Sequence, residues 1–182
     1  MAIILAIGYL LGGRLRNLSD LTIEWSWLAL IGLALQFVTG PGSTVPLVCL
    51  YLSFGLLIVF TIKNIRVFGF AVILAGVLAN LLVIGINGGM PVSKHALRSS
   101  DQGQFLGELE NNPYPKHHLA TDDDLLRYLG DVIAVPSPIE QAISVGDILT
   151  YGGVGIVIVA AMRKPSGQPQ PVSNPEVAHA GG

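Results

Sequence analysis

Residues 87–93 of the chain are Asn-Gly-Gly-Met-Pro-Val-Ser, and they open a polar insert that ends at Ala142. The insert holds three of the four histidines and eight of the twelve acidic residues. The rest of the chain consists mostly of long apolar segments separated by short turns. We therefore expect one soluble lobe on a hydrophobic body, with any chemistry carried by the lobe.

The overall composition is typical of a protein that lies in a bilayer. Of the 182 residues, 51% are hydrophobic and 12% are charged, which is about half the charged share of an average soluble domain. The net charge of −2 and the lack of a large Lys/Arg cluster argue against nucleic acid as a partner. The single cysteine, Cys49, cannot form an internal disulfide or a metal cluster.

Five apolar segments have, or approach, the length of a membrane-spanning helix. They are residues 1–18, 23–39, 45–62, 67–86 and 145–162. We predict an all-α integral membrane protein with about five transmembrane helices and one extracytoplasmic, partly helical lobe between helices 4 and 5. The predicted domains are a four-helix membrane region (1–86), the lobe (87–142), the fifth helix (143–164) and a disordered cytoplasmic tail (165–182).

The first segment is the weakest of the five, because its apolar run ends at Gly13, after about 20 Å of helix. Gly8 and Gly12 form a G-x-x-x-G pair, which predicts close packing on a neighbouring helix. The second segment holds Gln36, which we interpret as a polar tie between helices or as a contact to lipid headgroups. Asn80 is the only strongly polar residue of the fourth segment.

Basic residues near the segment ends decide the predicted orientation. They form three pairs, Arg14 with Arg16, Lys63 with Arg66, and Arg163 with Lys164. All three lie on one side of a five-helix arrangement, and the positive-inside rule places that side in the cytoplasm. We therefore predict a multi-pass protein of the bacterial plasma membrane, with the N-terminus and the lobe outside and the C-terminus cytoplasmic.

The first five residues of the insert have two interpretations. Gly88 or Gly89 can end the fourth helix with a positive φ, and Pro91 prevents its continuation. Alternatively, the glycines allow a ligand to approach the backbone closely. On that interpretation the ligand-binding residues are Asn87, Gly88, Gly89, Met90 and Pro91.

Two carboxylates of the lobe region have a structural explanation, and one does not. Thr121 with Asp124, and Ser144 with Asp147, have the spacing of capping boxes at helix starts. A cation site at Asp122–Asp124 is the alternative for the first pair. Asp131 starts no helix. Its structural alternatives are a bond to the backbone amides of the turn at 136–138 or a cap on the fifth helix from outside, and it is our first candidate for a catalytic carboxylate.

His95, His117 and His118 are the histidines that could act with Asp131 as acid and base. His117 and His118 are adjacent, so they do not converge on one helix face, and the H-x-x-x-H spacing of a helical zinc site is absent. We predict no metal site and no cofactor.

Four motifs occur together in the chain: GGRLRNL (12–18), NGGMPVS (87–93), LGDVI (129–133) and SVGDIL (144–149). With this combination the chain resembles a family of small bacterial integral membrane proteins of unknown function. The resemblance covers nearly all of the chain except the tail. It implies a membrane location and one outward-facing group containing Asn87, Met90, Pro91 and Asp131, and it implies no mechanism.

Three functions are compatible with these features. The sequence favours a non-catalytic accessory or scaffold subunit whose lobe docks a membrane protein or a second copy of the chain, and it leans against an enzyme. An enzyme acting on a lipid or isoprenoid headgroup requires Asp131 and a histidine in one pocket at the membrane surface. A polar cavity that reaches Asn80 and Gln36 would favour a small-molecule binder or permeation component.

Overall fold

The computed structural model of the protein describes residues 2–38, 44–111 and 116–163. The chain divides into two compact units. The larger unit is Ile23–Val157, and the smaller one combines Met1–Thr22 with Ile158–Gly182. The predicted disordered tail and the turn at 40–43 lie outside the described residues.

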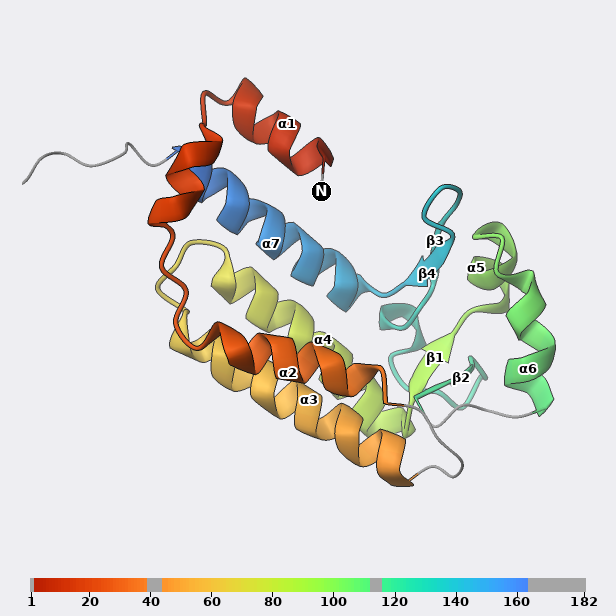
Figure 1. Cartoon of the computed structure of the whole chain (residues 1–182). Helices are drawn as coiled ribbons and strands as arrows, with labels where there is room; N and C mark the ends of the chain where they lie inside the picture. The colour runs from red at the N-terminus through yellow and green to blue at the C-terminus, as the bar shows by residue number, and fades with distance from the viewer. Residues whose placement is uncertain (1, 39–43, 112–115, 164–182) are drawn as a thin grey trace, which may run out of the picture. The chain divides into compact units, whose positions relative to one another are not determined.

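Helices α2 (Ser26–Gln36), α3 (Thr44–Lys63) and α4 (Phe70–Asn87) and the first part of α7 (Val145–Arg163) form the body of the larger unit (Figure 1). Helices α3, α4 and α7 are long and apolar enough to cross a membrane. Large apolar side chains remain exposed along them, including Val48, Leu52, Val59, Leu78 and Leu82. A surface of this kind is favourable against hydrocarbon and supports a membrane location.

The structure supports three of the five predicted spans. In the described residues, the first apolar segment forms α1 (Ala2–Leu10) and the second forms α2, with 9 and 11 residues. They reach about 14 and 17 Å, less than the hydrocarbon thickness of about 30 Å. Gly12 takes a φ of 81° after α1, and Trp25 takes a φ of 55° before α2. These left-handed residues lie where the apolar runs meet charged residues, Gly12 two residues before Arg14 and Trp25 directly after Glu24, and they limit both helices.

Polar side chains join α2 to α3 at both ends of α2. Before α2, the side chain of Asn64 donates to the Glu24 carbonyl and accepts from the Glu24 amide, each at 2.8 Å. At the C-terminus, Gln36 Nε2 donates to Ser53 Oγ at 3.0 Å. The predicted role of Gln36 as a tie between helices is confirmed.

Helices α4 and α7 approach closely because glycines of one helix face glycines of the other. On each side the two glycines are seven residues apart, at 69 and 76 and at 146 and 153. A Cβ atom on Gly69 would lie 2.8 Å from the carbonyl oxygen of Gly153, and one on Gly146 would lie 2.7 Å from that of Gly76. Side chains at these positions would separate the two antiparallel helices. Close packing here fixes the start of α7 beside Asn80.

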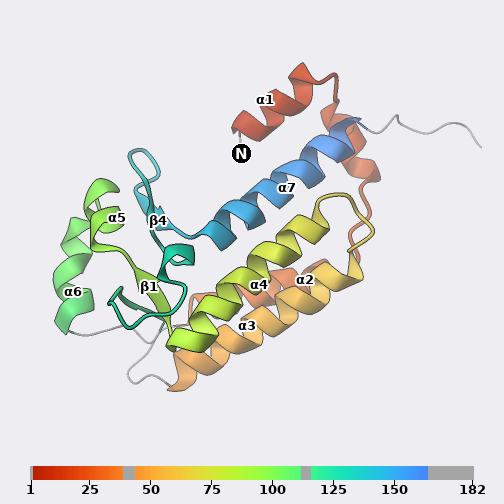
Figure 2. The same cartoon turned by 180° about the vertical axis from the view of Figure 1, so that it is seen from behind.

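The lobe is only partly helical, and it also contains short strands (Figure 2). Helices α5 (Lys94–Ser99) and α6 (Leu106–Asn111) and the 3-10 turn η2 (Gly103–Phe105) cover a small apolar core around Val92, Leu97 and Leu109. Strands β1 (Met90–Val92) and β2 (His117–Leu119) pair in parallel, and β3 (Ile133–Val135) and β4 (Gln141–Ile143) pair antiparallel. The prediction of an all-α protein is wrong for the lobe, because three-residue strands are too short to show a period of two in sequence.

The helix predicted to start at Thr121 does not form. Asp124 Oδ2 does accept from the Thr121 amide at 2.7 Å, as in a capping box. However, Leu126 takes a left-handed φ of 53°, and only the 3-10 turn η3 (Arg127–Leu129) follows. In the described lobe, the bond between Thr121 and Asp124 therefore closes a turn and does not start a helix.

The smaller unit contains α1, the 3-10 helix η1 (Leu15–Asp20) and the end of α7. Gly8 packs against the side chain of Met162, and Asn17 Nδ2 donates to the Met162 carbonyl at 2.7 Å. A Cβ atom on Gly12 would meet nothing within 4 Å. The predicted close packing of this helix on a neighbour is therefore confirmed at Gly8, whereas Gly12 serves the turn after α1.

Candidate functional site

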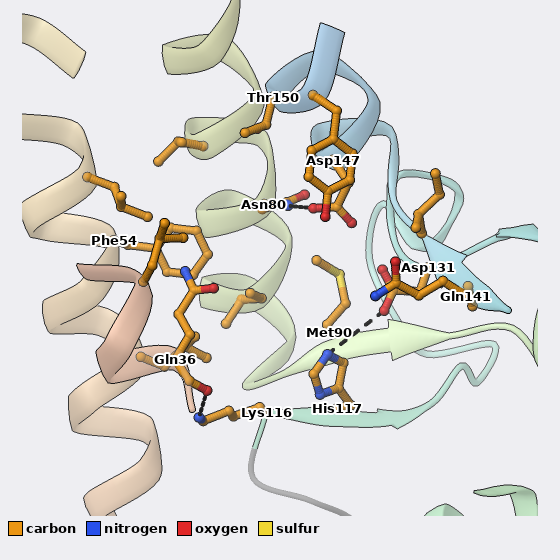
Figure 3. A pocket seen from close by; sticks show the side chains of 18 residues that line it. Gln36, Phe54, Asn80, Met90, Lys116, His117, Asp131, Gln141, Asp147 and Thr150 are labelled. Atoms are coloured by element: carbon orange, nitrogen blue, oxygen red, sulfur yellow. Dashed lines mark hydrogen bonds and ion pairs between the residues drawn. The ribbon is translucent and has the colours of Figure 1, made fainter. Parts of the chain in front are cut away.

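A cavity of about 340 Å³ lies in the larger unit, between the lobe and the apolar helices (Figure 3). Its size is within the range of about 300–1,000 Å³ that is usual for small-molecule sites. Helices α2, α3, α4 and α7 and strands β1, β2 and β4 all contribute side chains to it. Polar and apolar groups occupy different parts of the wall.

The apolar part of the cavity lies among the helices and includes Leu33, Phe54, Leu57 and Val77. From α3 the cavity is lined by Leu50, Phe54 and Leu57, so it extends about 10 Å along this helix. Its far end, at Leu57, lies about 20 Å from Thr44, where α3 begins near the lobe. Helix α3 is long and apolar enough to cross a membrane, and Leu57 lies in its second half.

The polar part of the cavity is built where two sequence motifs meet. The Asp131 amide donates to the Pro91 carbonyl, and the Ser93 amide donates to the Asp131 carbonyl, each at 3.0 Å. A Cβ atom on Gly130 would collide with the Pro91 carbonyl oxygen, so this approach requires a glycine. The backbone contact directs the Asp131 side chain into the cavity beside β2 (Figure 3).

Asp131 and His117 face each other across this polar part. His117 Nε2 lies 3.9 Å from Asp131 Oδ2. Burial raises the pKa of Asp131 to about 7, and the negative charge of Asp147 adds to the effect. Burial lowers the pKa of His117, and the neighbouring Lys116 ammonium lowers it further. The pair therefore holds a carboxyl group that changes charge near neutral pH beside an imidazole that is mostly neutral there.

Asp147 contributes a second carboxylate from the first turn of α7. Asp147 Oδ2 accepts from the Ser144 amide, and the Asp147 amide donates to Ser144 Oγ, both at 3.0 Å. The predicted capping box is confirmed. Asp147 Oδ1 accepts from Asn80 Nδ2 at 2.9 Å, and Asn80 Oδ1 accepts from Ser144 Oγ at 2.8 Å. This network fastens Asn80, in the second half of α4, to the start of α7.

Lys116 ties the lobe to the C-terminus of α2. Its Nζ atom donates to the carbonyl oxygens of Gln36 at 2.6 Å and Val38 at 2.8 Å. The last carbonyls of a helix lack intrahelical partners and carry partial negative charge, so an ammonium group is favourable there. Burial lowers the pKa of Lys116. Much of the hydrogen-bonding capacity of this cation is thus used by the protein itself.

A second cavity, of about 290 Å³, lies on the lobe side of the same polar groups. It shares His117, Asp131, Gln141 and Ala142 with the first cavity. Its remaining wall is mostly the apolar core of the lobe beneath α5 and α6, including Leu97 and Phe105. The polar pair therefore lies between two apolar compartments.

Of the five residues at 87–91 predicted to bind a ligand, most contact other parts of the protein and do not face the cavity. Asn87 Oδ1 accepts from the Leu125 amide, and Asn87 Nδ2 donates to the Val83 and Leu125 carbonyls, each at 2.9 Å. Gly88 ends α4 with a φ of 69°. Pro91 and Gly89 are buried in the backbone junction, and Met90 is the only one of the five that lines the first cavity.

The structure separates the three candidate histidines. His117 lies beside Asp131, whereas His118 Nε2 is 2.8 Å from Asp124 Oδ1. Burial acts to raise the pKa of Asp124, but hydrogen bonds from Thr121 and His118 hold it below its usual value. His95 is exposed and lines a separate pocket with Arg127 and Tyr128. Among the described residues, no group of three or more His, Cys, Asp or Glu side chains is placed to hold a metal ion.

Sequence inspection missed several groups of the site, above all Lys116, Gln141 and Tyr151. Tyr151 is four residues after Asp147 on α7, so helical spacing would have placed it on the same face. Lys116 gave no such signal, because its partners are carbonyl oxygens 78 and 80 residues away.

Comparison with known proteins agrees with the resemblance seen in the motifs. Residues 20–159 match a family of unknown function, DUF5317. The chain belongs to this family. The matched stretch includes the three motifs that meet around the cavity, those at 87–93, 129–133 and 144–149.

The DUF5317 assignment is accompanied by one distant relative. A protein of Thermotoga maritima, described as uncharacterized, is 32% identical over 174 residues, which are 94% of this chain and 92% of the relative. No solved structure matches the chain.

Proposed function

We propose that the protein binds a small amphipathic molecule in the cavity between its lobe and its apolar helices. The observation that carries the proposal is the division of this one cavity into a polar part and an apolar part. Asp131, His117 and Lys116 line the former, and Leu33, Phe54 and Val77 line the latter. The cavity also reaches Gln36 and Asn80, which favours a small-molecule binder.

An analysis of co-purified molecules tests this proposal. The full chain is purified from its native membrane in mild detergent, and bound molecules are extracted and identified by mass spectrometry. Val77→Phe fills the cavity, because Val77 is 5% exposed and lines its apolar part. Leu78→Phe is the matched control, because the neighbouring side chain is 45% exposed.

The proposal expects one molecule or a narrow class to be retained by the wild type and Leu78→Phe and lost from Val77→Phe. The same set of lipids from all three proteins would overturn it. Thermal unfolding of the variants shows whether Val77→Phe is folded before its content is compared.

A second candidate function is acid–base catalysis on the bound molecule. It is supported by the 3.9 Å separation of His117 Nε2 and Asp131 Oδ2 in one pocket, the arrangement that the enzyme hypothesis required. Asp131 is able to give a proton and His117 to accept one near neutral pH. Incubating the extracted molecule with wild type and with His117→Gln distinguishes catalysis from binding. A product formed by the wild type alone supports catalysis, and unchanged molecule in both argues against it.

The scaffold role favoured by the sequence is a separate proposal. Its support is the small size of the chain and the exposed apolar surface of its helices. Size measurement in mild detergent tests it, and a strictly monomeric, partner-free protein would count heavily against it.

A further inference from the structure

We propose that the molecule bound in the cavity is an organic cation, an amine with an apolar body, whose ammonium group pairs with Asp131. This inference rests on the proposed function and names the class of ligand. It follows from the charged groups of the polar part, which differ in how far the protein already uses them.

Asp131 is the carboxylate that the protein leaves available. The residue is 8% exposed, and its side chain lies in the walls of both cavities. Within the described part of the chain, the carboxylate accepts no hydrogen bond, and its one ion-pair neighbour is His117 at 3.9 Å. A buried carboxylate without a hydrogen-bonded partner is costly, so a cationic ligand gains the interaction that the protein does not supply.

The other charged groups around Asp131 favour a cation over an anion. Asp147 faces the same space from α7 and adds a second negative charge. Lys116, on the β2 side, is held by two carbonyl oxygens of the α2 end. The pKa of His117 is lowered, so its imidazole adds little positive charge near neutral pH. Tyr151, on α7, adds a neutral hydroxyl group.

The apolar part of the cavity explains why the ligand carries more than an ammonium group. It is lined by side chains of α2, α3 and α4, namely Leu33, Phe54, Leu57 and Val77. A simple metal or ammonium ion would leave these surfaces without contacts. An alkyl or ring body of a lipophilic amine buries them and gains hydrophobic energy.

Binding of such an amine depends on pH, because the ammonium pairs with the ionised carboxylate. With the pKa of Asp131 at about 7, the ionised fraction falls about 30-fold between pH 8 and pH 5.5. Alkylamines remain protonated over this range, since their pKa is near that of lysine, about 10.4. Affinity should therefore fall by the same factor as the pH is lowered.

The experiment measures binding of n-octylamine to the purified full chain in detergent by isothermal titration calorimetry at pH 8 and pH 5.5. n-Octanol and n-octanoate serve as neutral and anionic probes of equal length. Asp131→Asn removes the carboxylate, and Asp123→Asn, at an exposed position, is the matched control.

We expect octylamine to bind more tightly than octanol and octanoate at pH 8. Its affinity should be about 30-fold lower at pH 5.5. Asp131→Asn should lower the affinity at pH 8 at least 10-fold, and Asp123→Asn should leave it unchanged. Equal or tighter binding of octanol or octanoate overturns the amine class. If Val77→Phe abolishes the binding of octanol or octanoate, the cavity still binds a small amphipathic molecule, and only the amine class is wrong. Octylamine binding that is unchanged in Asp131→Asn, or no measurable octylamine binding at pH 8, also overturns the amine proposal.

Discussion

Asp131 shows how one residue receives its properties from distant parts of the chain. Its backbone is fixed by Pro91 and Ser93, and its carboxyl group faces His117 and shares a cavity with Asp147. None of these neighbours gives it a hydrogen-bonded cation. The folded protein therefore favours the protonated carboxyl group over the ionised one.

This preference predicts a pH-dependent effect of Asp131→Asn on stability. The folded pKa, about 7, is raised from 3.8, so the wild type loses stability as the pH rises from about 4 to 7. The loss amounts to as much as ~4 kcal/mol, from ~1.4 kcal/mol per pH unit. We expect Asp131→Asn to match the wild type near pH 4.5 and to be more stable by a few kcal/mol at pH 8.

Unfolding in detergent at both pH values measures the difference, with Asp123→Asn as the control. A difference between wild type and Asp131→Asn that is the same at pH 4.5 and pH 8 would show that Asp131 ionises as an ordinary exposed carboxylate does.

At the scale of the element, the placement of α7 decides whether the site exists. Glycines at 69, 76, 146 and 153 let α7 lie against α4, and this contact brings Asp147 to Asn80. Seven-residue spacing on both helices keeps the glycines on one face over two turns of each. The polar end of the cavity therefore forms only because these four positions carry no side chain.

This packing predicts that Gly76→Ala destabilises the protein. A Cβ atom on Gly76 would lie 2.7 Å from the Thr150 amide nitrogen and closer still to the Gly146 carbonyl oxygen. Overpacking of this kind costs about 1–3 kcal/mol. Gly85→Ala, in the same helix with nothing within 4 Å, should be neutral or slightly stabilising. Unfolding by sodium dodecyl sulfate titration compares the two, and equal effects would contradict the tight α4–α7 contact.

At the scale of the whole molecule, the distribution of basic residues predicts which side of the membrane the lobe lies on. The loop with Lys63 and Arg66 lies at the opposite ends of α3 and α4 from the lobe. From the positive-inside rule we propose that this loop is cytoplasmic and that the lobe lies outside. On this orientation, the amine proposed above reaches the cavity from the outer surface or the outer leaflet.

Cysteine labelling tests this orientation. In a Cys49→Ser background, Asp123→Cys places a thiol on the lobe and Arg66→Cys places one on the opposite loop, both at exposed positions. We expect a membrane-impermeant maleimide to label Asp123→Cys in intact cells and Arg66→Cys only after lysis. The reverse pattern would place the lobe in the cytoplasm.

The sequence by itself determined the apolar segments, the polar insert and the capping box of Ser144 with Asp147, because these depend on composition and on contacts within a few residues. It also singled out Asp131 as a candidate, because this carboxylate has no such local explanation. Only the tertiary structure decided that α1 and α2 are short, that the lobe contains strands, and that Lys116, His117, Asp131 and Asp147 share a cavity with Gln36 and Asn80. The physical reason is the sequence distance between interacting residues. Hydropathy and capping act along neighbouring residues, whereas the cavity arises from backbone contacts and glycine packing between residues 40–84 positions apart.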